Sequence, residues 1–232
     1  MKRIVEPEWI DQLDPASLEA RRTRGELRRM NALMRNFDWF RAQLARHPSL
    51  FGRGLELGAG DGHLGAYLFA DPTTRRRLDL VGIDRIGRPP AWPEDWRWEQ
   101  KDILRFEGWR DFPLLLANMV LHHFSAEELA LLGSRIRDSC RLLLALETAR
   151  RGMHLAQVRA LRVFGILGPV GYHDASTSIQ AGFVGEELPQ LLGLPSSEWH
   201  WQIRLTFFGA YQLVAERRSS GVPARTRQFR RA

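Results

Sequence analysis

The sequence predicts an α/β fold: a doubly wound, mostly parallel, seven-stranded sheet whose last strand is antiparallel, with helices on both faces. Two observations lead to this prediction. Short apolar runs that are typical of buried strands alternate with segments of helical periodicity through the middle of the chain. A glycine-rich turn at 58–62 follows the first of these runs and precedes a helical segment, which gives the order strand, turn, helix.

The first element along the chain is a helical extension. Between about Ser17 and Arg46, apolar residues recur at steps of three and four, so we expect one stripe of this helix to pack inward. Pro48 then prevents the helix from continuing. The helix therefore ends before the first strand.

The remaining elements follow from the same two periodicities. Ser125 and Glu128 form a capping box, which marks a helix start. The Gly168-Pro169 pair ends the helical pattern before it, and Gly209 separates a final pair of strands. The predicted strands are 54–57, 78–83, 96–100, 114–118, 141–146, 200–208 and 210–216, and the predicted helices after the extension are 63–70, 125–137, 154–167 and 186–192.

The length of 232 residues suits one domain with additions at its ends. We predict a helical extension at 1–50 and a sheet domain at 51–216, with a small helical cap at about 150–184. Residues 217–232 have the composition of a disordered tail, with six arginines and no acidic residue.

The composition limits the classes of protein and site. The single cysteine, Cys140, allows neither an internal disulfide nor a cluster of thiolate metal ligands, and the acidic residues and histidines lack the compact spacing of a metal site. The N-terminus lacks the apolar stretch of a signal peptide, and no apolar run approaches the ~20 residues of a membrane span. We therefore expect a soluble, cytoplasmic protein with no metal.

The positive charge is concentrated near the two ends of the chain. The net charge is +7, while residues 21–46 and 217–232 each carry +6, so the rest of the chain is acidic. Basic ends can contact nucleic acid or anionic surfaces. An arginine-rich proteome with solvated termini explains the same pattern.

Acidic residues follow the predicted strands at the edge where ligands bind in such sheets. Asp84 lies 24 residues after Gly60, and its carboxylate can accept both hydroxyls of a ribose. Asp102 can reach an adenine amino group, with Ile103 against the ring. A helix cap or a turn is the alternative for each of the two aspartates.

Two further polar residues lie at strand ends. Asn118 can face the amino-acid end of a cofactor, and Glu56 can accept an ammonium group. A nicotinamide dinucleotide is the competing ligand, but its pyrophosphate is disfavoured beside Glu56 and Asp61, and the glycine spacing differs from its fingerprint. A zwitterionic ligand that carries a sulfonium fits these charges better.

At this point the chain resembles the class I S-adenosylmethionine-dependent methyltransferases, which have a Rossmann-like fold. Residues 56–62 are similar to the first motif of that family, 82–84 to its second, 101–104 to its third and 116–124 to its fourth. The resemblance implies S-adenosylmethionine as the cofactor. It places the methionine part at Gly58, Gly60 and Gly62, the ribose at Asp84, and the adenine at Asp102 and Ile103.

Two other segments bear on the acceptor and the adenine. Residues 171–183 resemble small bacterial methyltransferases that act on polyketide-like and quinone-like metabolites. Between Asp84 and Trp96, where the family usually has a helix, the segment 87–93 is too rich in proline to form one. We expect the adenine side of the pocket to be remodelled there and closed by Trp92.

A phenolic or enolic acceptor also needs a base, for which histidine is suited near neutral pH. His173, after a glycine-rich turn beside the cap, and His122, after the fourth strand, are our predicted catalytic residues. His123 is an alternative to His122, and His154 is expected to be structural.

Three kinds of function remain open from the sequence. We predict methyl transfer to a small molecule, with a hydroxyl of an aromatic, quinone-like or polyketide-like metabolite as the target. The alternatives are a nucleic-acid methyltransferase that uses the basic termini and a non-catalytic binding protein. The fourth strand ends in Ala117-Asn118-Met119-Val120, which lacks the Pro-Pro-aromatic string used to hold a base amino group. The intact glycine turn argues against the non-catalytic alternative.

Overall fold

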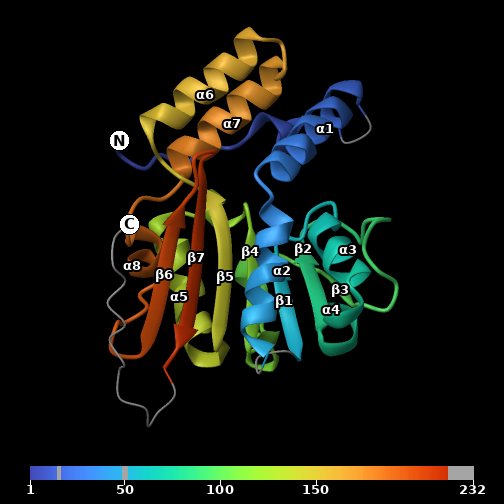
Figure 1. Ribbon diagram of the computed structural model, residues 1–232, viewed down its shortest axis with the longest axis vertical. Coiled ribbons are helices and arrows are strands. Elements are labelled where there is room, and N and C mark those ends of the chain that lie inside the picture. The colour runs from blue at the N-terminus through green and yellow to red at the C-terminus, as the bar shows by residue number, and fades with distance from the viewer. Residues whose placement is uncertain (15–16, 49–51, 219–232) are drawn as a thin grey trace.

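The computed structural model describes residues 1–14, 17–48 and 52–218. Its centre is one seven-stranded sheet with the strand order β3-β2-β1-β4-β5-β7-β6, in which β7 runs antiparallel between β5 and β6 (Figure 1). This is the predicted fold class. The strands are β1 (Arg53–Leu57), β2 (Asp79–Asp84), β3 (Trp98–Gln100), β4 (Leu114–Asn118), β5 (Leu142–Thr148), β6 (Trp199–Leu205) and β7 (Ala210–Arg217).

Helices cover both faces of the sheet. On one face, Phe40 of α2 and Leu64 of α3 pack with apolar side chains of the sheet. On the other face, Leu132 of α5 and Leu188 of α8 do the same. The helices are α1 (Leu18–Leu33), α2 (Asn36–Arg46), α3 (His63–Ala70), α4 (Pro72–Arg77), α5 (Ala126–Ser139), α6 (Gly152–Val163), α7 (Pro169–Ala181) and α8 (Glu187–Leu191), with short 3-10 helices η1 (Trp9–Gln12), η3 (Ile103–Arg105), η4 (Gly108–Asp111) and η5 (Leu121–His123).

The central strands are mostly apolar because both of their faces are covered. Every residue of β5 is buried, as are the first four residues of β4. At the carboxyl ends of these strands, α1, α6 and α7 lie together above the sheet (Figure 1). In the described part of the chain, none of the helices has both the length and the apolar content needed to cross a lipid bilayer.

The predicted N-terminal helix is in fact two helices. The chain breaks at Arg35, whose φ is 53°, so α1 and α2 have different directions. The break lets α2 pack on the sheet while α1 leans on α7, where buried Glu26 accepts from the Gly168 N–H at 3.1 Å. Periodicity did not reveal the break, because Met34 and Phe37 continue the apolar spacing across it.

The segment after Gly168 lies within the predicted helical cap, but it forms the helix α7, with Pro169 in its first turn, where a glycine-rich turn was expected before His173. Proline is tolerated there because the first N–H groups of a helix have no partner within the helix. The helix α4 was not predicted either, although Asp71 caps it by accepting from the Thr74 N–H at 2.8 Å.

Candidate active site at the carboxyl edge of the sheet

The glycine-rich turn joins β1 to α3 and is held by a carboxylate of the next strand. Gly58, Gly60 and Gly62 have φ values of 60°, 52° and 74°, a region that glycine adopts without strain. The Gly60 N–H donates to Asp84 Oδ2 at 2.9 Å. A Cβ on Gly58 would overlap the Val120 side chain. Asp84 and the segment after β4 therefore fix the shape of the turn.

A cavity of about 320 Å³ lies beside this turn, at the carboxyl ends of the strands. We call it the edge cavity. Four of the residues predicted to bind the cofactor line it: Gly58, Asp84, Asp102 and Ile103. Asp102 also caps η3, because its Oδ1 accepts from the Leu104 N–H at 2.8 Å. The complete lining is Asp11, Gly58, Asp84, Arg85, Asp102, Ile103, Leu104, Met119, Val120, His123, Phe124 and Glu128.

Two other residues predicted to bind the cofactor have a buried side-chain oxygen without a hydrogen-bond partner among the described residues. Glu56 is 2% exposed and its Oε2 lacks a partner, as does Oδ1 of Asn118 at the end of β4. Glu56 is in register with Leu116, two residues before Asn118, so both side chains lie on one face of the sheet. Burial, with the charge of Asp84, raises the pKa of Glu56 to about 8. An ammonium group would satisfy these acceptors and favour the ionised carboxylate.

The remodelled segment after β2 does not close this cavity with Trp92. The segment has no helix between Asp84 and β3, as predicted. Trp92 is 2% exposed and is packed between α3 and β2, where a Cβ on Gly65 would overlap its ring. The Trp92 indole therefore fills the core between α3 and β2, where the family usually has a helix, and does not line the edge cavity. Gly62 contacts the same segment, because a Cβ there would lie 2.9 Å from Pro89.

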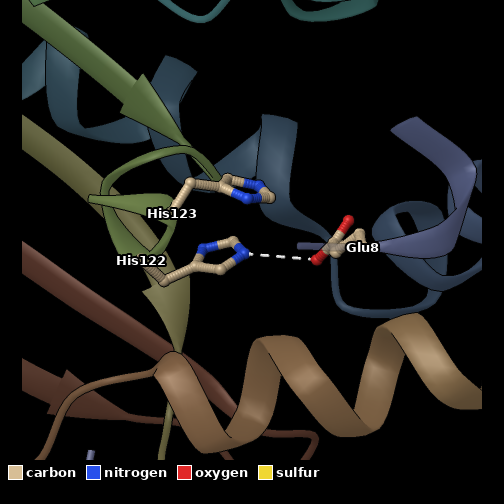
Figure 2. Close-up of side chains that lie close together, drawn as sticks. All are labelled: Glu8, His122 and His123. Atoms are coloured by element: carbon tan, nitrogen blue, oxygen red, sulfur yellow. Dashed lines mark ion pairs between the residues drawn. The ribbon is translucent and has the colours of Figure 1, made fainter. Parts of the chain in front are cut away.

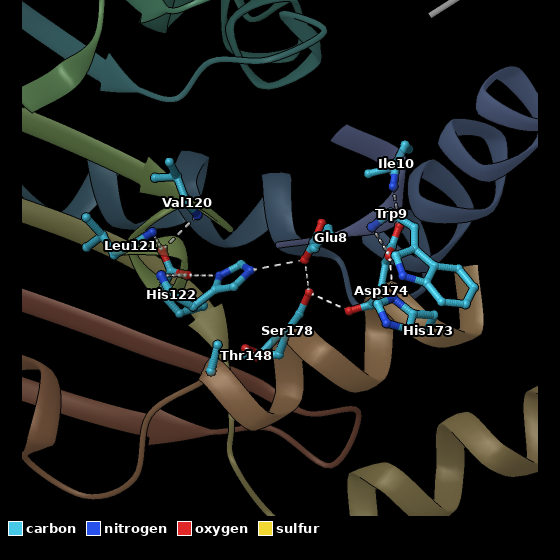
Figure 3. A network of polar contacts seen from close by, with 12 residues as sticks. Glu8, Trp9, Ile10, Val120, Leu121, His122, Thr148, His173, Asp174 and Ser178 are labelled. Carbon is cyan, nitrogen blue, oxygen red and sulfur yellow. Dashed lines mark hydrogen bonds and ion pairs between the residues drawn. The ribbon is translucent and has the colours of Figure 1, made fainter. Parts of the chain in front are cut away.

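His122 belongs to a buried network that joins the N-terminal segment to the sheet (Figure 3). Its Nδ1 lies 2.7 Å from Glu147 Oε2 on β5, and its Nε2 lies 3.6 Å from Glu8 Oε1. Burial lowers the pKa of His122, but contacts with Glu147 and Glu8 outweigh this and raise the pKa to about 9. Glu147 also accepts from the N–H groups of Val120 and Leu121 at 3.1 and 2.9 Å. His122 is thus an imidazolium that helps to hold the segment after β4.

The same network brings together three side chains of the types that bind metal ions. Donor atoms of Glu8, His122 and His123 lie within 4.8 Å of one another (Figure 2). Burial and the nearby charge of His122 lower the pKa of His123 to about 4, so its ring is neutral. The carboxylates of Glu8 and Glu147 flank His122, so ion pairing by itself explains why these side chains lie close together. The expectation that the protein needs no metal stays a prediction.

A second cavity, of about 120 Å³, lies between α1, α6, α7 and the β6–β7 turn. We call it the apolar cavity. Met119 lines both cavities and forms their shared wall. It has a left-handed backbone with φ of 58°, held by a bond from its N–H to the Leu146 carbonyl at 2.7 Å. The complete lining is Leu27, Met30, Met34, Met119, Thr148, His154, Gln157, Val158, Leu161, Ala175, Ser178, Ile179, Phe208 and Gly209.

His173 lines neither cavity. Its ring stacks on Trp9, with the centroids 3.8 Å apart. Its Nδ1 lies 3.0 Å from Asp174 Oδ1, and the Asp174 carboxylate also accepts from the backbone N–H groups of Trp9 and Ile10 (Figure 3). His173 borders a separate surface hollow beside Tyr172. The structure therefore gives His173 a place in docking the N-terminal segment, and its catalytic role stays a prediction.

Two other histidines occupy the cavities instead. His123 lines the edge cavity and His154 lines the apolar cavity. The sequence signal for His154 was weak, because a histidine on an apolar helix stripe is also typical of a packed core.

Comparisons with known proteins support the fold. No protein-family model matches the sequence, and no curated protein matches it. A plantazolicin methyltransferase in complex with a pentazolic desmethylPZN analog and SAH has a TM-score of 0.65 at 11% identity, covering 88% of this chain and 93% of that one. Magnesium protoporphyrin IX methyltransferase from Synechocystis PCC 6803, with bound SAH, has a TM-score of 0.53 at 15% identity, covering 90% and 92%. This chain therefore has the fold of the class I S-adenosylmethionine-dependent methyltransferases.

Proposed function

We propose that this protein transfers a methyl group from S-adenosylmethionine to a small, apolar acceptor. The observation that carries the proposal is the pair of cavities that share Met119. The edge cavity is polar and adjoins the glycine turn, whereas the apolar cavity is lined mainly by aliphatic and methionine side chains. A zwitterionic cofactor suits the first cavity, and an apolar acceptor suits the second.

The residues of the edge cavity and its walls fit this cofactor. Glu56 and Asn118 offer buried, unsatisfied oxygens for its amino group. Asp84 lies at the cavity and can accept from ribose hydroxyls, and Ile103, which is 6% exposed, offers an apolar surface to the adenine. Asp102 can accept from the adenine amino group while it caps η3. The sulfonium charge suits a cavity lined by four acidic residues and one arginine.

When bound, S-adenosylmethionine supplies an electrophilic methyl group. The chain must align the acceptor with that methyl group and exclude water. The helices α1, α6 and α7 enclose the apolar cavity, and Met119 separates it from the edge cavity. The network of Glu147 with His122 and Glu8 holds the N-terminal segment, of which Asp11 lines the edge cavity.

For the acceptor, we propose a hydroxyl group of an aromatic, quinone-like or polyketide-like metabolite. The compared enzymes are named for plantazolicin and for magnesium protoporphyrin IX. No comparison supports the nucleic-acid alternative, and residues 219–232 of the basic tail lie outside the described part of the chain. The cytoplasmic location stays a prediction.

Calorimetry with S-adenosylmethionine and with SAH tests the cofactor assignment. Asp84→Ala should weaken binding roughly 10- to 100-fold, because a charge-assisted hydrogen bond contributes about 1.5–3 kcal/mol. Gly60→Arg should abolish binding. Asp95→Ala, at an exposed position, is the matched control and should bind normally. Unchanged affinity in folded Asp84→Ala protein would refute the assignment.

A further inference from the structure

Among the residues that line the apolar cavity, His154 of α6 is the only one with a basic side chain, and none is acidic. The hydroxyl groups of the lining already have partners within the protein. Thr148 Oγ1 donates to the Ser178 carbonyl at 2.6 Å, and Ser178 Oγ donates to the Asp174 carbonyl at 2.9 Å. A polar group on an acceptor in this cavity therefore has His154 as its available partner.

Gln157, one turn later on α6, sets the orientation of the His154 ring. Its Nε2 donates to the Phe207 carbonyl at 3.2 Å, which leaves its Oε1 to face His154 Nδ1 at 2.9 Å. Nδ1 of the neutral ring must then carry the proton, and Nε2 has the free lone pair. Among the described residues, the hydrogen bond of the His154 ring is the one at Nδ1. The ring also rests on Gly209, where a Cβ would lie 3.2 Å from Cγ.

The size and the walls of the cavity indicate what can enter. A cavity of about 150 Å³ admits a benzene ring, so a space of about 120 Å³, whose lining includes the half-exposed Phe208, has room for about one ring. The side chains of Met30, Met34 and Met119 border it. Thioethers make favourable contacts with aromatic rings. The cavity is thus suited to one aromatic ring that carries a hydroxyl group.

We propose that His154 is the general base for methylation of a phenol, either a single ring or the ring at the end of a larger molecule. This inference rests on the proposed function. The phenol O–H bond breaks and its proton moves to His154 Nε2. The phenol oxygen forms a bond to the methyl carbon as the carbon–sulfur bond of the donor breaks, and that electron pair stays on sulfur. The products are a methyl ether and neutral SAH, and the imidazolium returns its proton to water. Gln157 is a positioning residue.

The first test measures proton transfer without turnover, with 4-nitrophenol as the probe because its phenolate is coloured. In the presence of SAH, and at a pH below the pKa of the free probe, the wild-type protein should bind the probe and produce the phenolate band. His154→Gln should bind the probe without that band. Gln157→Glu should strengthen the band, because a carboxylate at Nδ1 stabilises the imidazolium. His200→Gln, at an exposed position of β6, should behave as wild type.

The second test measures transfer of an isotopically labelled methyl group to a panel of one-ring phenols by mass spectrometry. His154→Gln should lower kcat roughly 100-fold or more while calorimetry shows unchanged affinity for S-adenosylmethionine. A kcat within threefold of wild type, or a phenolate band in His154→Gln, would overturn the role of His154. If the wild-type protein binds S-adenosylmethionine but neither the probe nor any phenol, the inference fails and the cofactor assignment stands. If it does not bind S-adenosylmethionine, the proposed function itself fails.

Discussion

The edge cavity and the apolar cavity share a wall, but they are built in different ways. The edge cavity is made from strand ends and a glycine turn, so its key positions are fixed by local backbone geometry. The apolar cavity is made where α1, α6 and α7 meet, and its residues come from positions 27 to 209. Under the proposed function, the methyl donor is therefore recognised by short motifs, whereas the acceptor is recognised by a cavity that the long-range packing of helices forms.

The largest effect is expected at the boundary between the two cavities. Glu147 is fully buried and binds both His122 and the backbone that follows Met119. Glu147→Gln should lower the free energy of unfolding by about 3–5 kcal/mol, because it removes one partner of a buried ion pair. It should weaken both cofactor and acceptor binding, which would show that the two cavities depend on one support. Urea unfolding and calorimetry measure these effects.

The pH dependence of the free energy of unfolding tests the same network. The folded pKa of His122, about 9, is above its ordinary value of 6.5, so its contribution to stability is complete below pH 6.5 and is lost as the pH rises through 9. Wild-type protein should therefore lose stability over that range, and Glu147→Gln should lose less. Glu198→Gln, in a half-exposed ion pair with Arg217, is the control and should change stability by under about 0.5 kcal/mol. Equal pH slopes in Glu147→Gln and wild type would contradict the network.

The contrast between the cavities also explains which features were predictable. The glycine turn, Asp84 and the capping box at Ser125 are local patterns, and the structure has them where the sequence places them. The contact of Glu8 with His122 joins segments that are far apart in the chain, so no spacing could indicate it. The position of His154 depends likewise on how α6 packs against other helices. The periodicity of the sequence predicts only that the face of α6 that carries His154 is buried.

An intermediate effect is expected from Glu56, which belongs to the edge cavity alone. Its folded pKa of about 8 is above the ordinary 4.5, so stability is lost as the pH rises from 4.5 through 8. Glu56→Gln should therefore stabilise the unliganded protein by about 1–3 kcal/mol at pH 8. The same change should weaken S-adenosylmethionine binding about tenfold, because the amino group loses a charged partner. Binding of 4-nitrophenol in the apolar cavity should stay unchanged. Lower stability together with unchanged cofactor affinity would contradict the role of Glu56.

The smallest effect is expected at the mouth of the apolar cavity, where the chain supplies its own control. Phe208 lines the cavity and is 51% exposed, whereas the adjacent Phe207 is 70% exposed and is not part of the lining. Phe208→Ala should raise KM for a ring acceptor severalfold, because the acceptor loses an aromatic contact worth about 0.5–1.5 kcal/mol. Phe207→Ala should leave KM unchanged, and neither variant should alter cofactor affinity. Because the two residues differ in cavity contact while both are exposed, equal KM values would place the acceptor outside the apolar cavity. A higher KM in Phe208→Ala alone would place the acceptor against that wall and would separate its recognition from that of the cofactor.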